Sequence, residues 1–231
     1  MKKRTLAAVV IAVVTLAGCI KNDGSVPPAR AGVLIDLVSP DATNTSITLN
    51  GNTIGSNVSY GSVPNYYNQV TPGAGNLTVL SSTGTSLLNQ NFNTESGKFY
   101  SIFVADSVSR MKTIIVADSV DYPNTADSVK VRFYNFAPNS IPLNVRMNDS
   151  TNVLDGRAFE SQASAEAYNT FLQMKAGTYR FQIFTINNTT TALKDTSITF
   201  DGSHIYSVFV KGFYPDTTGT TAIGLGIVKH G

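Results

Sequence analysis

Short runs in which apolar and polar residues alternate are the feature that most constrains the fold of this chain. In YRFQIF (residues 179–184) the two kinds change places at every step, and FYSIFV (99–104) and VKVRFYNF (129–136) are rich in β-branched and aromatic residues. Because successive side chains of a strand point to opposite faces, such runs bury one face of a sheet and leave the other in water. Asn, Gly, Pro and Ser separate the runs, as turn residues do. The pattern predicts an all-β fold.

The second half of the sequence repeats the first half in the same order. SPDATNTSITLN (39–50) aligns with APNSIPLNVRMN (137–148) at an offset of 98, AGNLTV (74–79) with AGTYRF (176–181) at 102, and YSIFV (100–104) with YSVFV (206–210) at 106. Offsets that grow by four twice indicate an internal duplication with two short insertions in the second copy. Each copy has the length of a seven-stranded sandwich of about 100 residues.

We therefore expect two tandem immunoglobulin-like antiparallel β-sandwich domains, residues 32–121 and 128–231, joined by a linker at 122–127. Around that linker, turn residues are frequent and core residues are few. ESQASAEAYNTFL (160–172) contains helix-forming alanines, and we expect at most one short helical turn there.

The N-terminus is typical of a signal for export. A basic KKR sequence (2–4) precedes the apolar run LAAVVIAVVTL (6–16). At about 1.5 Å per residue, that run reaches only about half the thickness of a bilayer core, so it is too short to span a membrane.

LAGC (16–19) resembles the lipobox of bacterial lipoproteins. The resemblance implies that a signal peptide of residues 1–18 is cleaved and that Cys19 is lipidated, with residues 19–31 as a polar tether. The alternative is an ordinary cleavage site that leaves an unpaired thiol. IKND (20–23) only partly resembles the surface-export signal of Bacteroidetes-type lipoproteins. We expect an exported outer-membrane lipoprotein, and both the periplasmic and the surface-facing placement stay open.

The charge of the chain gives no indication of a nucleic-acid partner. The net charge is +2, with 17 basic and 15 acidic residues. Cleavage after residue 18 would remove three of the basic residues and leave a chain close to neutral. No basic stripe remains to neutralise phosphates, so we expect no nucleic acid as a partner.

One stretch carries a resemblance to a known family. VRFYNFAPNS (131–140), followed by AGTYRFQIF (176–184) and YSVFV (206–210), resembles family 4397 of bacterial domains of unknown function, whose members often open with Val-Arg-apolar-apolar-His-Ala-Pro-Asp. The first copy is similar to the family through SPDA (39–42). The resemblance implies an exported β-sandwich in the cell envelope and supplies no established activity.

The residues offer little for catalysis. The His position of the family's opening holds Asn135 in the second copy and Leu37 in the first. The chain has only two histidines, of which His230 is penultimate, where chains fray, and His204 has its neighbour Ser203 on the opposite face of a strand. We expect a protein that is not an enzyme; an uncharacterised hydrolase that uses an aspartate is the third hypothesis.

Metal-ligand patterns are equally weak. Zinc needs clustered Cys and His, and the sequence has one cysteine, so it also has no partner for a disulfide. NDSTNVLDG (148–156) offers acidic and amide oxygens, but it does not have the helix-loop-helix spacing of a calcium site and favours a β-turn. We expect neither a metal nor another cofactor.

A tyrosine-rich connection is the candidate binding site. SYGSVPNYY (59–67) places Tyr60, Tyr66 and Tyr67 around Pro64. Tyrosines at the end of a sandwich can stack on sugars or anchor a protein partner, although tyrosines are also half-buried in ordinary β folds.

Asp followed by Ser or Thr recurs in this sequence. The motif resembles the O-glycosylation signal of Bacteroidetes proteins; the alternative is turn chemistry, because Asp and Ser side chains cap backbone groups at strand ends. The candidate modified residues are Ser107, Ser119, Ser128, Ser150 and Thr217.

These observations favour a non-enzymatic structural, adhesion or interaction module in the cell envelope. Its expected contacts are the membrane, through lipid on Cys19, and an envelope protein or polysaccharide. The alternative is a glycan-binding accessory lipoprotein that uses the tyrosines of the 59–67 connection.

Overall fold

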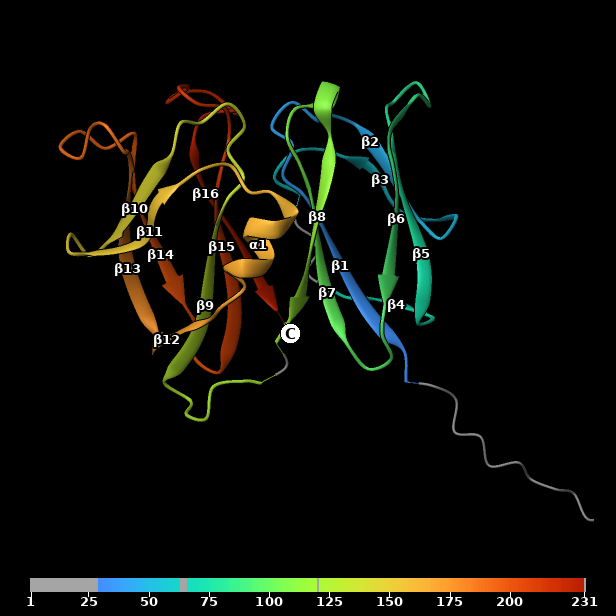
Figure 1. Ribbon diagram of the computed structural model, residues 1–231, viewed down its shortest axis with the longest axis horizontal. Coiled ribbons are helices and arrows are strands. Elements are labelled where there is room, and N and C mark those ends of the chain that lie inside the picture. The colour runs from blue at the N-terminus through green and yellow to red at the C-terminus, as the bar shows by residue number, and fades with distance from the viewer. Residues whose placement is uncertain (1–28, 63–65, 120, 231) are drawn as a thin grey trace, which may run out of the picture.

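The computed structural model describes residues 29–62, 66–119 and 121–230, and the regular secondary structure in this part of the chain is almost entirely β (Figure 1). Its 16 strands form four four-stranded sheets, which are stacked side by side. The first half of the chain forms two of the sheets and the second half forms the other two.

The first sandwich pairs the sheet β4-β1-β7-β8 with the sheet β3-β2-β5-β6. Its strands are β1 (Ala31–Leu37), β2 (Thr45–Leu49), β3 (Asn52–Val58), β4 (Asn68–Val70), β5 (Gly73–Leu80), β6 (Ser86–Thr94), β7 (Phe99–Ala105) and β8 (Lys112–Asp118), with a 3₁₀ turn at Val108–Arg110.

The second sandwich pairs β12-β9-β15-β16 with β11-β10-β13-β14. Its elements are β9 (Ser128–Asn135), β10 (Leu143–Met147), β11 (Thr151–Arg157), α1 (Gln162–Ala167), β12 (Leu172–Lys175), β13 (Gly177–Thr185), β14 (Lys194–Phe200), β15 (His204–Lys211) and β16 (Gly224–His230).

The two sandwiches have the same strand order, since each strand of the second corresponds to the strand of the first that is eight places earlier. Each has eight strands rather than the seven that the length suggested, because the connection before β5 or β13 contributes a further short strand, β4 or β12. The named strands pair antiparallel except for one central parallel pair in each sandwich, β1 with β7 and β9 with β15. A parallel pair needs a long crossover, which the strands of the second sheet supply here.

Each sandwich encloses its own apolar core. In the first, Val33, Ile35 and Leu37 of β1 belong to one buried cluster with Ile47 and Leu77 of the facing sheet. The second sandwich has the corresponding cluster on β9, β10, β13 and β15. The period of two along the strands therefore packs the inside of both sandwiches, as the sequence predicts.

The sheets β4-β1-β7-β8 and β12-β9-β15-β16, called the inner sheets below, are buried on their second face as well. Their outward faces meet in a third apolar cluster, which we call the seam (Figure 1). Every residue of β1 is buried. The expectation of one buried face and one face in water is wrong for the inner sheets, because each sheet covers the other. The seam contains Leu34, Val38, Phe103, Ala105, Ile114, Val116, Tyr134, Phe136, Ala165, Phe209 and Val228.

The helix α1 closes the seam at its edge. Ser161 caps it, with its side chain accepting from the Ser164 backbone N–H, and Ala165 is buried in the seam. The Gln162 side chain donates to the Ile115 carbonyl (2.6 Å) and accepts from the Ile115 N–H (2.9 Å). One side-chain amide of the second sandwich thus pairs with the edge strand β8 of the first as a further strand would.

Truncation of an aromatic residue in the seam should destabilise the whole protein. Phe209→Ala removes a ring that lies 5.6 Å from both Phe103 and Phe136, between centroids. We expect a loss of about 3–5 kcal/mol in the free energy of unfolding, measured with denaturant. The control Ile186→Ala, at a residue that is 48% exposed, should stay within about 0.5 kcal/mol. Similar losses in the two variants would contradict a stabilising seam.

Candidate functional site

Three places in the structure gather side chains with possible functions. Two lie in the seam, namely a closed cluster of polar groups and a pocket with unpaired polar groups. The third is an open groove that recurs in both sandwiches. Each of these places contains one of the three tyrosines predicted from the 59–67 connection. For the groove, that tyrosine lies in the first sandwich.

The polar cluster, called the seam cluster below, is built on Arg132 of β9. The side chains of Arg132 and Asp118 have no exposed surface and form an ion pair across the seam. Arg132 Nε donates to Ser207 Oγ (2.7 Å), and Nη1 donates to Asn169 Oδ1 (2.7 Å) and to the Ala117 carbonyl (3.0 Å). One guanidinium therefore ties β8 of the first sandwich to β9, β15 and the α1–β12 connection of the second.

Tyr67 and His230 complete this cluster. The Tyr67 hydroxyl donates to Asp118 Oδ2 (2.8 Å) and lies 2.8 Å from His230 Nδ1, while His230 Nε2 lies 2.7 Å from Ser207 Oγ. Because the Tyr67 proton goes to Asp118, His230 Nδ1–H is the donor to Tyr67 and Nε2 accepts from Ser207. The hydrogen bonds then form a closed ring, from Arg132 through Ser207, His230 and Tyr67 to Asp118.

Burial sets the protonation of the ring. It lowers the pKa of His230 to about 4, although the nearby Asp118 carboxylate acts in the opposite direction. It also raises the pKa of the Tyr67 hydroxyl, and Asp118 adds to that rise. His230 is therefore neutral near pH 7, as the donor pattern of the ring requires.

The ring contains a serine, a histidine and an aspartate, but it does not have the geometry of a catalytic triad. Tyr67 stands between His230 and Asp118, whose Nδ1 and Oδ2 atoms are 3.8 Å apart. The Ser207 hydroxyl accepts from Arg132, and Ser207 and His230 are 0% and 2% exposed. A nucleophile must reach its substrate. The cluster joins the sandwiches, and its serine, histidine and aspartate side chains are buried.

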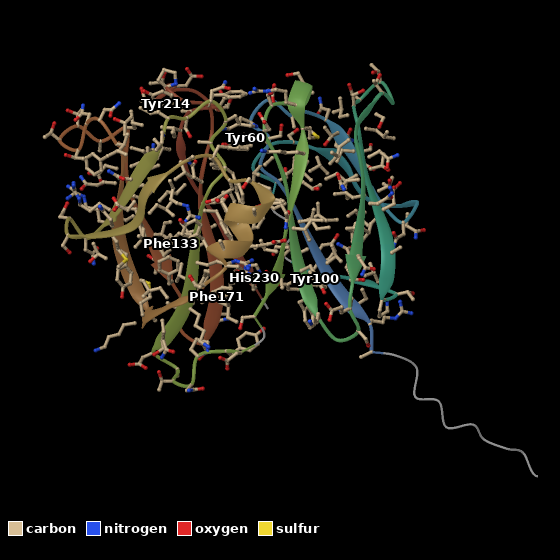
Figure 2. All side chains as sticks on the ribbon, viewed as in Figure 1. Tyr60, Tyr100, Phe133, Phe171, Tyr214 and His230 are labelled. Carbon is tan, nitrogen blue, oxygen red and sulfur yellow. The ribbon has the colours of Figure 1, made fainter. Side chains whose placement is uncertain are left out.

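His230 corrects an expectation from the sequence. The sequence predicts that this residue frays, but His230 is the last residue of β16, where it pairs with Ile205 of β15, and it lies between the two sandwiches (Figure 2). His204 begins β15, with Nδ1 2.5 Å from the Gly202 carbonyl oxygen. Its neighbour Ser203 lies in the turn before this strand, not on the opposite face of it.

The second place, called the seam pocket below, holds Asp36, Tyr60 and Lys211. It is a cavity of about 220 Å³ between β1, β15, β16 and the turn after β3. Both carboxylate oxygens of Asp36 and the Tyr60 hydroxyl are buried without a hydrogen-bond partner among the described residues. Lys211 Nζ lies 4.7 Å from the centre of the Tyr60 ring. Burial raises the pKa of Asp36 to about 7, against the opposing influence of Lys211.

The third place is a groove along the open side of each sandwich, between the edge strands of its two sheets. In the first sandwich Ile35, Ile54 and Val58 line a cavity of about 220 Å³, with Tyr66 beside it. Tyr66 is 57% exposed, so its ring is available to a ligand. We call this the first groove.

The corresponding groove of the second sandwich is larger, about 420 Å³, and Phe133 and Phe171 lie along it (Figure 2). Arg157 packs its guanidinium 3.4 Å from the centre of the half-exposed Tyr168 ring and pairs with the buried Glu160 at 2.6 Å. The same side of both sandwiches is therefore open and partly aromatic.

The structure does not bring the three predicted tyrosines together. Tyr66 lines the first groove, Tyr60 lies in the seam pocket, and Tyr67 belongs to the seam cluster. Their spacing in sequence could not show this, because the connection crosses from the open side of the sandwich to the seam. The sequence analysis also did not predict Asp36, because its burial depends on the second sandwich that covers this face of β1. A charged residue inside the apolar run VLIDLV (33–38) is nevertheless a signal of a buried polar group.

The remaining candidates have simple placements. Cys19 lies outside the described residues. Of the predicted glycosylation residues, Ser150 and Thr217 are exposed in connections, whereas Ser107, Ser119 and Ser128 are partly buried at strand ends or beside them. In the loop weighed for calcium, the Asp149 carboxylate pairs with Arg180 at 2.7 Å.

The described part of the chain has neither a metal-binding cluster nor a helix that could cross a membrane. It contains no group of three or more His, Cys, Asp or Glu residues placed to hold a metal ion. Within the same ranges, none of the helices has the length and apolar character that a membrane crossing requires.

Comparisons with known proteins give a family and a distant solved structure. The family model described as "Domain of unknown function (DUF4397)" matches residues 31–146, half of the chain, from β1 into β10. No curated protein matches. A solved structure from Bacteroides eggerthii, described as a "putative cell adhesion protein", is 10% identical over 87% of this chain and 95% of that one, with a TM-score of 0.19. A similarity this low carries no argument about function.

Asp36 and His230, two buried titratable groups of the seam, should make stability depend on pH in opposite ways. Burial raises the pKa of Asp36 from 3.8 to about 7, so the folded state holds the extra proton and stability falls as pH rises through this window. Burial lowers the pKa of His230 from 6.5 to about 4, so the unfolded chain holds the extra proton and stability rises with pH. In the wild type the two effects oppose each other.

Single variants should separate these effects in melting temperatures measured between about pH 4 and 7. Asp36→Asn leaves the His230 effect, so its melting temperature should rise with pH. His230→Gln leaves the Asp36 effect, so its melting temperature should fall with pH. Equal slopes in the two variants would refute this assignment.

Proposed function

This chain belongs to the family of domains of unknown function DUF4397. We propose that it is a non-enzymatic adhesion or interaction module of the cell envelope. The observation that carries the proposal is the seam, which joins the two sandwiches through a continuous apolar and hydrogen-bonded contact. A module of this kind presents its binding surfaces in a fixed relation to each other.

The open grooves supply the surfaces for such contacts. Each sandwich exposes a tyrosine beside an apolar groove, Tyr66 at 57% and Tyr168 at 50%. Exposed aromatic rings beside apolar grooves are typical anchors for partners. In the seam cluster, Tyr67 and Arg132 occupy the His230 and Ser207 side chains, and hydrolysis is not part of the proposal.

Attachment to the membrane is the second part of the proposal. The lipobox-like LAGC (16–19) would place a lipid on Cys19, and the polar residues after it would link the lipid to β1. In Figure 2 the described chain begins at the lower edge of the first sandwich, and Tyr60 lies at the upper edge of the molecule. The loops near Tyr60 would then face away from the membrane.

Replacement of the acceptor residue tests the attachment. Cys19→Ser should move the protein from the membrane fraction to the soluble fraction of cells, because the lipid is the proposed anchor. Fractionation with antibody detection measures this, and circular dichroism of the purified variant controls for folding. A variant that stays in the membrane fraction would contradict lipidation at Cys19.

The runner-up function is glycan binding, which the exposure of Tyr66 favours. If the first groove binds polysaccharide, Tyr66→Ala should weaken saturable binding at least about tenfold in a panel of polysaccharides. Tyr122→Ala, at a tyrosine that is 44% exposed between the sandwiches, is the matched control and should bind as the wild type does. Equal binding by both variants would exclude the first groove as the site.

A further inference from the structure

The seam pocket contains polar groups that the protein itself leaves unpaired. Asp36 is 1% exposed and both of its oxygens lack a hydrogen-bond partner among the described residues, as does the Tyr60 hydroxyl. An unpaired buried polar group costs about 1–3 kcal/mol, and more if it is charged. No hydrogen bond in the described structure compensates for this cost, in contrast with Asp118, the paired carboxylate of the seam cluster.

The lining of the pocket includes one acidic and one basic side chain, Asp36 and Lys211. The Lys211 ammonium lies over the Tyr60 ring, and it is near enough to Asp36 to act on that carboxyl electrostatically. A metal cation or an organic amine would pair with Asp36 but would be repelled by Lys211. An anion would pair with Lys211 but would be repelled by Asp36. The combination therefore favours a ligand without net charge.

A hydroxyl group suits all three residues. It can donate to the Asp36 carboxylate and accept from the Lys211 ammonium or the Tyr60 hydroxyl. The remaining walls are apolar, as the C–H faces of a sugar ring require, and they come from Leu37, Val38, Phe209, Leu225 and Ile227. The cavity, about 220 Å³, is smaller than the usual pocket for drug-sized ligands, so it suits a ligand of about one ring.

We propose that the seam pocket is a binding site for a small neutral polyhydroxylated ligand, a monosaccharide or the terminal sugar of a glycan. Asp36 accepts hydrogen bonds from ligand hydroxyls, and Lys211 and Tyr60 donate to them. The site is distinct from the first groove, because it requires residues of both sandwiches. It goes beyond the proposed adhesion role, which does not need it.

Ligand-observed NMR on the purified full chain tests the site. The probes are glucose, galactose, mannose and N-acetylglucosamine, with choline and acetate as the charged controls. We expect saturable binding of at least one sugar in the millimolar range and weaker binding of both charged controls. Asp36→Leu and Lys211→Met should each weaken that binding about tenfold or more.

Two further measurements keep a folding defect apart from a binding defect. Because Asp36→Leu removes an unpaired buried carboxyl, its melting temperature at neutral pH should rise above that of the wild type. Tyr66→Ala, which changes only the first groove, should bind the sugar as the wild type does.

Other outcomes would overturn the proposal. These are the absence of saturable binding by every sugar, tighter binding of choline or acetate, or a lower melting temperature for Asp36→Leu. Sugar binding that is lost in Tyr66→Ala and kept in Asp36→Leu would refute the seam pocket and support the first groove instead.

Discussion

The buried guanidinium of Arg132 is the group on which the arrangement of the two sandwiches depends. Its side chain has no exposed surface, and removing one partner of such a buried ion pair costs about 3–5 kcal/mol. Its partners come from both sandwiches, namely Asp118 and the Ala117 carbonyl on β8, and Ser207 and Asn169 in the second half. The apolar residues of the seam could pack in several registers, but the directional bonds of Arg132 favour one. The seam is therefore stabilised by apolar burial and specified by one polar ring.

Asp118 and Asp36 are both buried in the seam, but they differ in their hydrogen-bond partners. Asp118 pairs with Arg132 and accepts from Tyr67 and Ser101. Asp36 has no such partner among the described residues, and its burial raises its pKa to about 7. Ligand-binding sites often contain buried polar groups that have no hydrogen-bond partner within the protein, and these groups lower its stability. The contrast within one interface is the reason to assign a structural role to one group and a binding role to the other.

Much of the fold could be predicted from the sequence, because period-two alternation and turn residues act locally. The strands, the shared order of the two halves and the separate cores all followed from such patterns. The seam could not be predicted from these patterns, because burial of the second face of a sheet depends on what covers it. A signal did exist: VLIDLV (33–38) and YSVFV (206–210) are nearly continuous apolar runs, which are typical of sheets covered on both faces. The site residues were harder, since Tyr60, Tyr66 and Tyr67 are neighbours in sequence but separate in space.

The similarity of the two halves also explains why some equivalent positions in the seam hold different residues in the two sandwiches. Phe103 corresponds to Phe209 at the offset of 106, and these rings lie 5.6 Å apart. Asp118 faces Phe99 on β7 just as His230 faces Ile205 on β15, so these two also correspond, and they too meet across the seam. Equivalent positions thus lie together, as in a two-fold dimer. Apolar residues can meet their own kind, but two buried carboxylates would repel each other. The position equivalent to Asp118 therefore holds a different residue, the neutral His230, and Tyr67 links the two side chains by hydrogen bonds.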